Sequence, residues 1–144
     1  MDYKDLGFYQ KAQLVVRELN TELNVWPKSM QAHTISRQLF RATTSVGANI
    51  AEGHGRHQGK EYIHFLIIAQ GSANEVDHWL NTALDCSIGS PQSLHRIIYL
   101  NKETRKMLTA TIKSLRTKHQ VKELSETPTP YSPAPNPLIL DDDL

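Results

Sequence analysis

The chain has a single cysteine, Cys86, and no apolar run longer than the five residues from Phe65 to Ala69. One thiol cannot form an intramolecular disulfide, which excludes a disulfide-stabilised secreted scaffold. Cys86 lies among apolar residues, so we expect it to be buried rather than nucleophilic. The apolar run is far shorter than the roughly 20 residues of a membrane-spanning helix, and the N-terminus, MDYKDLGFYQKAQ, lacks the apolar segment of a signal peptide. We therefore expect a cytoplasmic protein without a membrane partner.

The net charge is also small, +1, because two regions of opposite charge offset each other. Residues 1–119 hold 15 Lys/Arg and 10 Asp/Glu, a net of +5, whereas residues 120–144 have a net of −4. The second region contains five of the seven prolines and ends in LILDDDL. This composition predicts one domain over residues 1–119 and a disordered, partly polyproline II tail over residues 120–144. The tail is either untethered, a short linear motif, or an acidic competitor for the basic part of the chain.

Apolar residues at helical spacing predict four helices, over residues 3–23, 29–52, 60–87 and 91–118. Pro27 ends the first helix, and we expect Trp26 before it to cover one end of the core. Ser90 and Pro91 suit the N-cap and the first position of the last helix. The helix over residues 60–87 has two apolar stripes, so it is either central to a bundle or part of a subunit interface. Together these features predict an all-α four-helix bundle.

The chain is organised around residues 39–56, LFRATTSVGANIAEGHGR. Side chains this small permit a second helix to pack closely, while Gly, Ser and Thr weaken the helix itself. Gly71 and Ser72 in the next helix permit the same close approach. We expect Gly53 to end its helix in the left-handed conformation. The polar residues here are interpreted as a structural latch, with a ligand site as the alternative. The latch consists of Asn49, Glu52, Gly53 and Arg56.

The helix over residues 91–118 has a strongly basic outer face. Between residues 93 and 119, seven Lys or Arg residues are opposed only by Glu103. Complementation of the helix dipole explains basic residues near the C-terminal end but not Arg96 or Lys102. Lys60, which follows a glycine-rich connector, either binds an anion at a helix N-terminus or belongs to a solvated turn. We predict that nucleic acid is bound by Arg56, Lys60, Arg96, Lys102, Arg105, Lys106, Lys113, Arg116 and Lys118.

The patterns for catalysis and metal binding are incomplete. A nucleotide P-loop requires G-x-x-x-x-G-K-[ST] after a strand, whereas here an acidic residue follows the lysine and a helix precedes it. A di-iron site needs Glu-x-x-His pairs on two different helices, whereas Glu61 with His64 and Glu75 with His78 both fall in the predicted helix over residues 60–87. His57, Glu61 and His64 can share a helix face, but such clusters are more often solvated. We predict no enzymatic activity, no cofactor and no metal site, and a metal-dependent enzyme is the least supported alternative.

The segments QLFRATTSVGANIAEGHGR and EYIHFLIIAQGSANEV resemble the motifs of a family first noted as proteins encoded in intervening sequences of bacterial 23S ribosomal RNA genes. The family pattern is Q-L-R-R-A-x-x-S-[VI]-x-x-N-I-A-E-G-x-G-R, then F-[LY]-x-x-A-x-G-S-x-x-E. The chain departs from it at Phe40, where a basic residue is usual, which weakens a phosphate-binding role for that turn. The resemblance covers about residues 3–118. Among the matching polar positions are Gln38, Arg41, Ser45, Asn49, Glu52, Arg56, Ser72 and Glu75.

The resemblance implies an antiparallel up-down four-helix bundle that assembles as a ring-like homo-oligomer, commonly a pentamer. The family is similar to accessory proteins of diversity-generating retroelements, which partner a reverse transcriptase and bind nucleic acid. We therefore predict a non-catalytic homo-oligomeric scaffold for nucleic acid, with RNA as the expected class and a reverse transcriptase as a further expected partner. The alternative is a protein–protein adaptor for which nucleic-acid binding is incidental.

Overall fold

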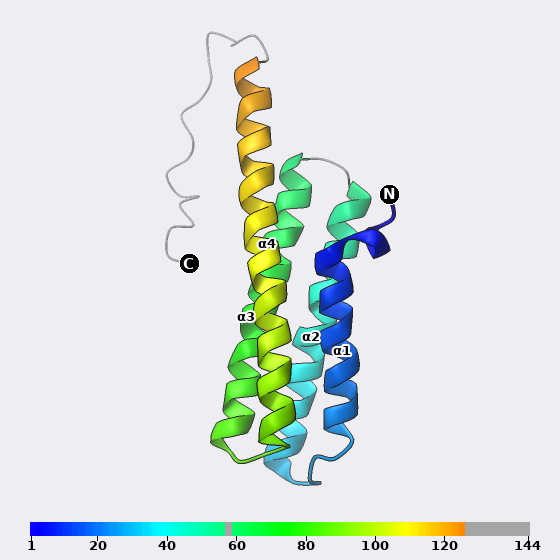
Figure 1. Ribbon diagram of the computed structural model, residues 1–144, viewed down its shortest axis with the longest axis vertical. Coiled ribbons are helices and arrows are strands. Elements are labelled where there is room, and N and C mark those ends of the chain that lie inside the picture. Colours follow the sequence, from blue (N-terminus) through cyan, green and yellow to red (C-terminus); the bar gives the residue numbers. More distant parts are fainter. Residues whose placement is uncertain (57–58, 126–144) are drawn as a thin grey trace.

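The computed structural model describes residues 1–56 and 59–125, so most of the predicted tail lies outside the described residues. Its elements are a short 3₁₀ helix, η1 (Tyr3–Asp5), and four α-helices, α1 (Gly7–Leu23), α2 (Met30–Arg56), α3 (Gly59–Asp85) and α4 (Pro91–Ser125). No strand occurs in the described ranges. The predicted all-α four-helix bundle is therefore confirmed (Figure 1).

The four helices run alternately up and down along one axis (Figure 1). Each helix packs against two neighbours, so the order around the bundle is α1, α2, α3, α4 and back to α1. The apolar stripes meet in the centre, and their removal from water is the main favourable term in folding. Completely buried members of this core include Leu19, Leu39, Ile50, Leu66, Leu80, Leu94 and Leu108. None of the described helices combines the length and apolarity that a bilayer-spanning segment requires.

The end of α2 differs from the prediction. Gly53 does not end the helix, because α2 continues to Arg56 and only residues 57 and 58 separate it from α3. Gly53 is buried, and a Cβ atom added to it would lie 2.7 Å from Cβ of Phe65 and 3.2 Å from Cδ2 of Tyr62. The absence of a side chain therefore allows α3 to approach α2 closely, rather than allowing a left-handed turn.

The end of α4 also differs from the prediction. The sequence pattern places it near Lys118, whereas α4 continues to Ser125 and projects past the other helices (Figure 1). Residues 120–125 are all exposed. Because these last turns bury no side chain, they need no apolar stripe, and periodicity could not reveal them.

A buried carboxylate from α1 holds the turn between α3 and α4. Glu22 is 4% exposed and accepts hydrogen bonds from the backbone amide of Ser90 (2.5 Å) and from Nε1 of Trp26 (3.3 Å). Gly89 in this turn has φ of 86°, and a Cβ atom there would lie 2.6 Å from Nε1 of Trp26. Trp26 packs against the core at this end of the bundle, as the sequence predicted.

Candidate nucleic-acid interface

Five of the predicted basic residues share one face of α4. Successive residues of an α-helix are rotated by about 100°, which places all five within a sector of roughly 100° that extends about 21 Å along the axis. The buried residues of α4 occupy the opposite side of the helix, so these cations face outward. The five are Lys102, Arg105, Lys106, Lys113 and Arg116.

Two adjoining grooves between α3 and α4 lie beside these cations. The first, of about 480 Å³, is lined by Gln70 and Asn74 of α3 and by Lys102, Arg105, Lys106, Thr109, Ala110 and Lys113 of α4. The second, of about 390 Å³, is lined by Gln70, Thr109, Ile112, Lys113, Arg116, Thr117 and Gln120. Nε2 of Gln70 donates a hydrogen bond of 2.7 Å to Oγ1 of Thr109, which joins the two helices where the grooves meet.

The cations along these grooves differ in how they are held. Nε of Arg105 donates to Oδ1 of Asn74 at 2.9 Å, and Nη1 of Arg105 lies 3.8 Å from Oδ2 of Asp77. These contacts hold the guanidinium against α3. The lysines Lys102, Lys106 and Lys113 are exposed and form no ion pair with any residue of the described ranges. Their ammonium groups are therefore available to an anionic ligand.

The structure does not bring the other four predicted cations to this face. Nη2 of Arg96 lies 3.0 Å from Oε1 of Glu18 on α1, so Arg96 belongs to the opposite side of α4. Nζ of Lys60 lies 3.6 Å from Oε1 of Glu123. Lys60 and Lys118 line a separate groove of about 420 Å³, in which an acidic residue of α3 also takes part. The fourth cation is Arg56, at the end of α2.

The predicted latch residues divide between two contacts along α2. Nη2 of Arg56 donates to Oε1 of Glu52 at 2.8 Å in an exposed ion pair one helical turn apart. Asn49 does not join this pair, because its Nδ2 donates to the carbonyl oxygen and to Oγ of Ser45, at 2.9 and 3.0 Å. Oγ of Ser45 lies 3.0 Å from Oγ of Ser72 on α3. Asn49 therefore supports the contact between α2 and α3 through Ser45.

A second polar cluster joins α2 and α3 nearby. Arg41 of α2 forms an ion pair with Glu75 of α3, and Gln38 accepts a hydrogen bond of 3.2 Å from Nε of Arg41. Nε1 of Trp79 donates to Oε2 of Glu75 at 3.3 Å. Gly71 has no atom within 4 Å of a built Cβ position, so it is not a point of close approach as expected. The polar motif residues of these two clusters serve the pairing of α2 with α3.

Groups suited to metal binding do not converge within the described ranges. No cluster of three or more His, Cys, Asp or Glu residues that could hold a metal ion occurs there, and His57 lies outside those ranges. Cys86 is exposed, contrary to expectation, because α3 ends at Asp85 and Cys86 begins the turn to α4. Burial raises the pKa of the Tyr62 hydroxyl above its ordinary value, which keeps this group neutral.

The sequence reasoning missed the contribution of α3 to the candidate interface. Gln70 and Asn74 carry no charge, so a search for basic residues does not find them. Their spacing of four residues nevertheless places both amides on one face of a helix. Thr109 was missed for the same reason, although it lies between Lys106 and Lys113 on the basic face of α4.

Comparison with known proteins agrees with this architecture. The family model described as 23S rRNA-intervening sequence protein matches residues 4–110. A protein of unknown function from the S23 ribosomal protein family of Bacteroides thetaiotaomicron has a similar crystal structure, with a TM-score of 0.65 and 28% sequence identity over 74% of this chain and 98% of that chain. No curated protein matches the chain. Because the family match extends from the start of the bundle into α4, the chain belongs to the 23S rRNA-intervening sequence protein family.

Proposed function

We propose that the chain is a non-catalytic homo-oligomeric scaffold that binds nucleic acid, RNA in the first instance, along the grooves between α3 and α4. The observation that carries this proposal is the row of outward cations beside two adjoining grooves. Contacts between Lys or Arg and phosphates supply most of the sequence-independent affinity for nucleic acid. The amides of Gln70 and Asn74 add groups that can hydrogen-bond to base edges or to the 2′-hydroxyl.

The geometry favours a single strand over a duplex. Tyr99 is 61% exposed and lies one helical turn before Lys102, on the same side of α4. Exposed aromatic rings beside a basic groove provide stacking platforms for unpaired bases. A strand that stacks on Tyr99 and then follows the groove would meet Lys102, Lys106 and Lys113 in turn.

The proposed scaffold is a homo-oligomer, and a ring of five is the form that we expect. Each added copy would repeat the same row of cations, and linked sites bind one strand more tightly than separate sites do. Native mass spectrometry or sedimentation equilibrium measures the subunit number. A chain that is monomeric at micromolar concentration would contradict this part of the proposal.

A salt titration of oligonucleotide binding tests the nucleic-acid proposal. The logarithm of the binding constant for labelled oligo(U) should fall linearly with the logarithm of salt concentration, with a slope of about 0.7 per phosphate contact. Replacing Lys102, Lys106 and Lys113 by Gln should lower that slope by roughly 2 and weaken binding at low salt.

A matched variant controls for net charge. Replacing Lys4, Lys11 and Arg17 by Gln removes the same charge from η1 and α1 and should leave the salt slope unchanged. Equal effects of the two triple variants, or binding that does not depend on salt, would remove the α3–α4 groove as the site. Oligo(dT) of equal length measures any preference for RNA.

A protein–protein adaptor remains the second candidate, because α3 exposes an apolar residue outside the core. Ile68 is 38% exposed on a helix that already contributes its other apolar stripe to the core. Copurification with the full chain and with a chain ending at Ser125 would separate partners of the bundle from partners of the tail. A reverse transcriptase encoded beside the gene is the first partner to test.

A further inference from the structure

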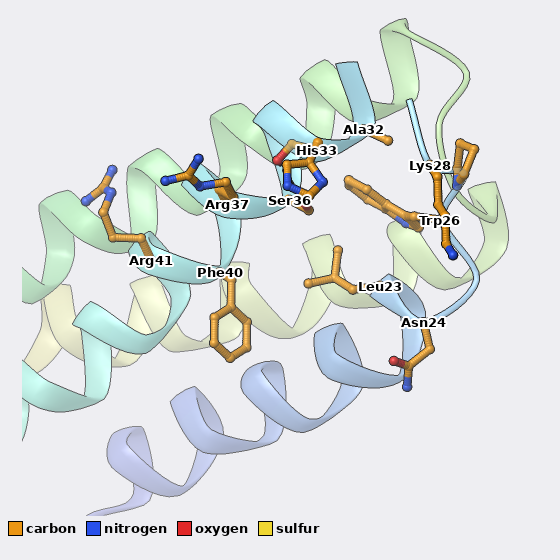
Figure 2. Close-up of a pocket in the computed structure, with 11 residues that line it drawn as sticks. Leu23, Asn24, Trp26, Lys28, Ala32, His33, Ser36, Arg37, Phe40 and Arg41 are labelled. Atoms are coloured by element: carbon orange, nitrogen blue, oxygen red, sulfur yellow. Dashed lines mark hydrogen bonds between the residues drawn. The ribbon is translucent and has the colours of Figure 1, made fainter. Parts of the chain in front are cut away.

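The groove where α1 meets α2 is larger than either groove of the proposed nucleic-acid site, at about 640 Å³. Its lining includes the apolar side chains Leu23, Trp26, Ala32 and Phe40. Figure 2 shows the Phe40 ring pointing from α2 toward α1, with Leu23 and Trp26 on the side of the connecting turn. The groove therefore offers an apolar floor formed by two helices and the turn between them.

Large apolar residues are also exposed on the segments that form this groove, and of these Phe40 lines it. Phe40 is 40% exposed, Val25 in the turn is 69% exposed, and Met30 at the start of α2 is 76% exposed. Exposed apolar side chains gathered around a hollow are typical of an interaction site, whereas scattered ones need no explanation. The structure therefore marks this end of the bundle as a place where an apolar segment can dock.

The polar residues of the groove define the charge of its occupant. Lys28, His33, Arg37 and Arg41 line it, and no Asp or Glu does. Arg41 is engaged by Glu75, but Lys28 and Arg37 form no ion pair with a residue of the described ranges. An occupant that matches this surface is an apolar segment followed by carboxylates.

The chain contains one segment with this chemistry. In residues 137–144, PLILDDDL, three aliphatic residues are followed directly by three aspartates. Nowhere else in the chain do three consecutive aliphatic residues adjoin three consecutive acidic ones. The charges are complementary, because the segment carries three carboxylates and the groove presents lysine and arginine side chains.

The reach of the tail favours a segment from another copy. With 35 residues, α4 is about 52 Å long, and its C-terminal end lies at the opposite end of the bundle from the α1–α2 turn (Figure 1). Leu138 follows Ser125 by 13 residues, which span at most about 45 Å when extended and about 40 Å as polyproline II. Within one chain the segment would reach this groove only when almost fully extended, whereas a second copy has no such limit.

We infer that the α1–α2 groove binds residues 137–144 of a second copy of this chain. Leu138, Ile139 and Leu140 occupy the apolar floor, and the three aspartates face Lys28 and Arg37. This contact does not rest on the proposed nucleic-acid function, because the lining of this groove shares no residue with the grooves between α3 and α4.

A peptide titration tests the groove. The protein is the full chain with Leu138, Ile139 and Leu140 replaced by Ser, which removes competition from its own segment. Fluorescence anisotropy follows a labelled peptide of residues 136–144, and a scrambled peptide of equal composition is the reference. Binding should saturate, and it should weaken at least about tenfold for Arg37→Glu, for Phe40→Ser and for the scrambled peptide.

The control variant reverses one charge in the other groove. Lys113→Glu changes the net charge by the same amount as Arg37→Glu and should leave peptide affinity unchanged. Circular dichroism should show that all variants keep their helical content, because the three replaced side chains are exposed. No saturable binding, equal binding of the scrambled peptide, or loss of binding in Lys113→Glu would overturn the inference. The last result would instead make the tail a competitor for the nucleic-acid groove.

A mixing experiment tests whether the segment comes from a second copy. One chain carries Arg37→Glu and Phe40→Ser, and the other carries the three Ser replacements in the tail. Each chain retains one half of the contact, so sedimentation velocity of the mixture should show faster-sedimenting material than either chain shows separately. If peptide binding persists but the mixture sediments as the sum of its parts, the segment does not join separate copies and the second-copy inference is wrong.

Discussion

Helix α3 packs against its two neighbours in different ways. Toward α2 it meets small residues, with Ser72 beside Ser45 and Phe65 against the bare backbone of Gly53. Toward α4 it leaves two grooves at the surface, bordered by lysines and crossed by the hydrogen bond from Gln70 to Thr109. We call the contact between α2 and α3 the closed seam, and the contact between α3 and α4, with its surface grooves, the open seam.

The difference separates the residues that pack the bundle from those of the proposed binding site. In the closed seam the polar groups hydrogen-bond to one another, so the motif residues Ser45, Asn49, Ser72 and Glu75 are occupied by the fold. In the open seam the lysines have no intramolecular partner among the described residues. The polar residues that match the family pattern thus lie mainly in the closed seam, whereas the proposed ligand contacts lie in the open one.

The largest effect on stability should come from adding one methyl group to the closed seam. In most helices Gly→Ala stabilises by up to about 1 kcal/mol. At Gly53 the added Cβ would lie 2.7 Å from Cβ of Phe65, which cannot rotate away because it is bonded directly to the backbone of α3. We expect Gly53→Ala to destabilise the bundle by about 2–3 kcal/mol. Urea unfolding measures this, and a stabilised variant would show that α3 can move away without loss.

The next largest effect is expected from a buried hydrogen bond between α3 and α4, beneath the grooves of the open seam. Asn101 is 2% exposed, and its Nδ2 donates a hydrogen bond of 2.9 Å from α4 to the carbonyl oxygen of Ala73 on α3. Asn101→Ala removes this bond and leaves a small cavity, so we expect a loss of about 1–2 kcal/mol. Thermal unfolding measures it. An unchanged melting temperature would mean that α3 and α4 are held by apolar contacts without this bond.

Much of the fold was predictable because it depends on local periodicity. The stripes that contain Leu19, Ile50, Leu80 and Leu108 are visible in the sequence, and all four residues are completely buried. Gly53 was misread because the reason for a glycine there lies in Phe65 of another helix. Sequence spacing shows which face of a helix is apolar, but it does not show how closely the neighbouring backbone approaches.

The candidate site was predictable only in part. The excess of positive charge on α4 is a property of composition, and it directed attention to that helix. Which cations of α4 face α1 and which face α3 could not be predicted without the order of the helices around the bundle. Arg96 turns toward Glu18 of α1, whereas Arg105 turns toward Asn74 of α3. The α1–α2 groove was not predicted at all, since its lining combines a turn with the ends of two helices.

A smaller effect of opposite sign is expected in the middle of α3. Gly71 lies on the exposed side of the helix, and a Cβ atom there meets nothing within 4 Å. Gly71→Ala should therefore stabilise the bundle by roughly 0.5–1 kcal/mol, through the lower conformational entropy of the unfolded chain. The same urea unfolding serves as the measurement. Opposite signs for Gly53→Ala and Gly71→Ala would separate close packing from helix propensity, whereas equal signs would contradict the distinction.

The smallest effect on stability is expected from a lysine of the open seam. The ammonium group of Lys106 is exposed and makes no ion pair with a described residue, so Lys106→Gln should change the free energy of unfolding by less than about 0.5 kcal/mol. If Lys106 contacts a phosphate, the same variant should lower the salt slope of oligo(U) binding by about 0.7. Arg17→Gln, an equal charge change on an exposed position of α1, should alter neither quantity. A Lys106 variant that loses stability but keeps its salt slope would place this residue in the packing of the bundle, and the contrast between the two sides of α3 would then fail.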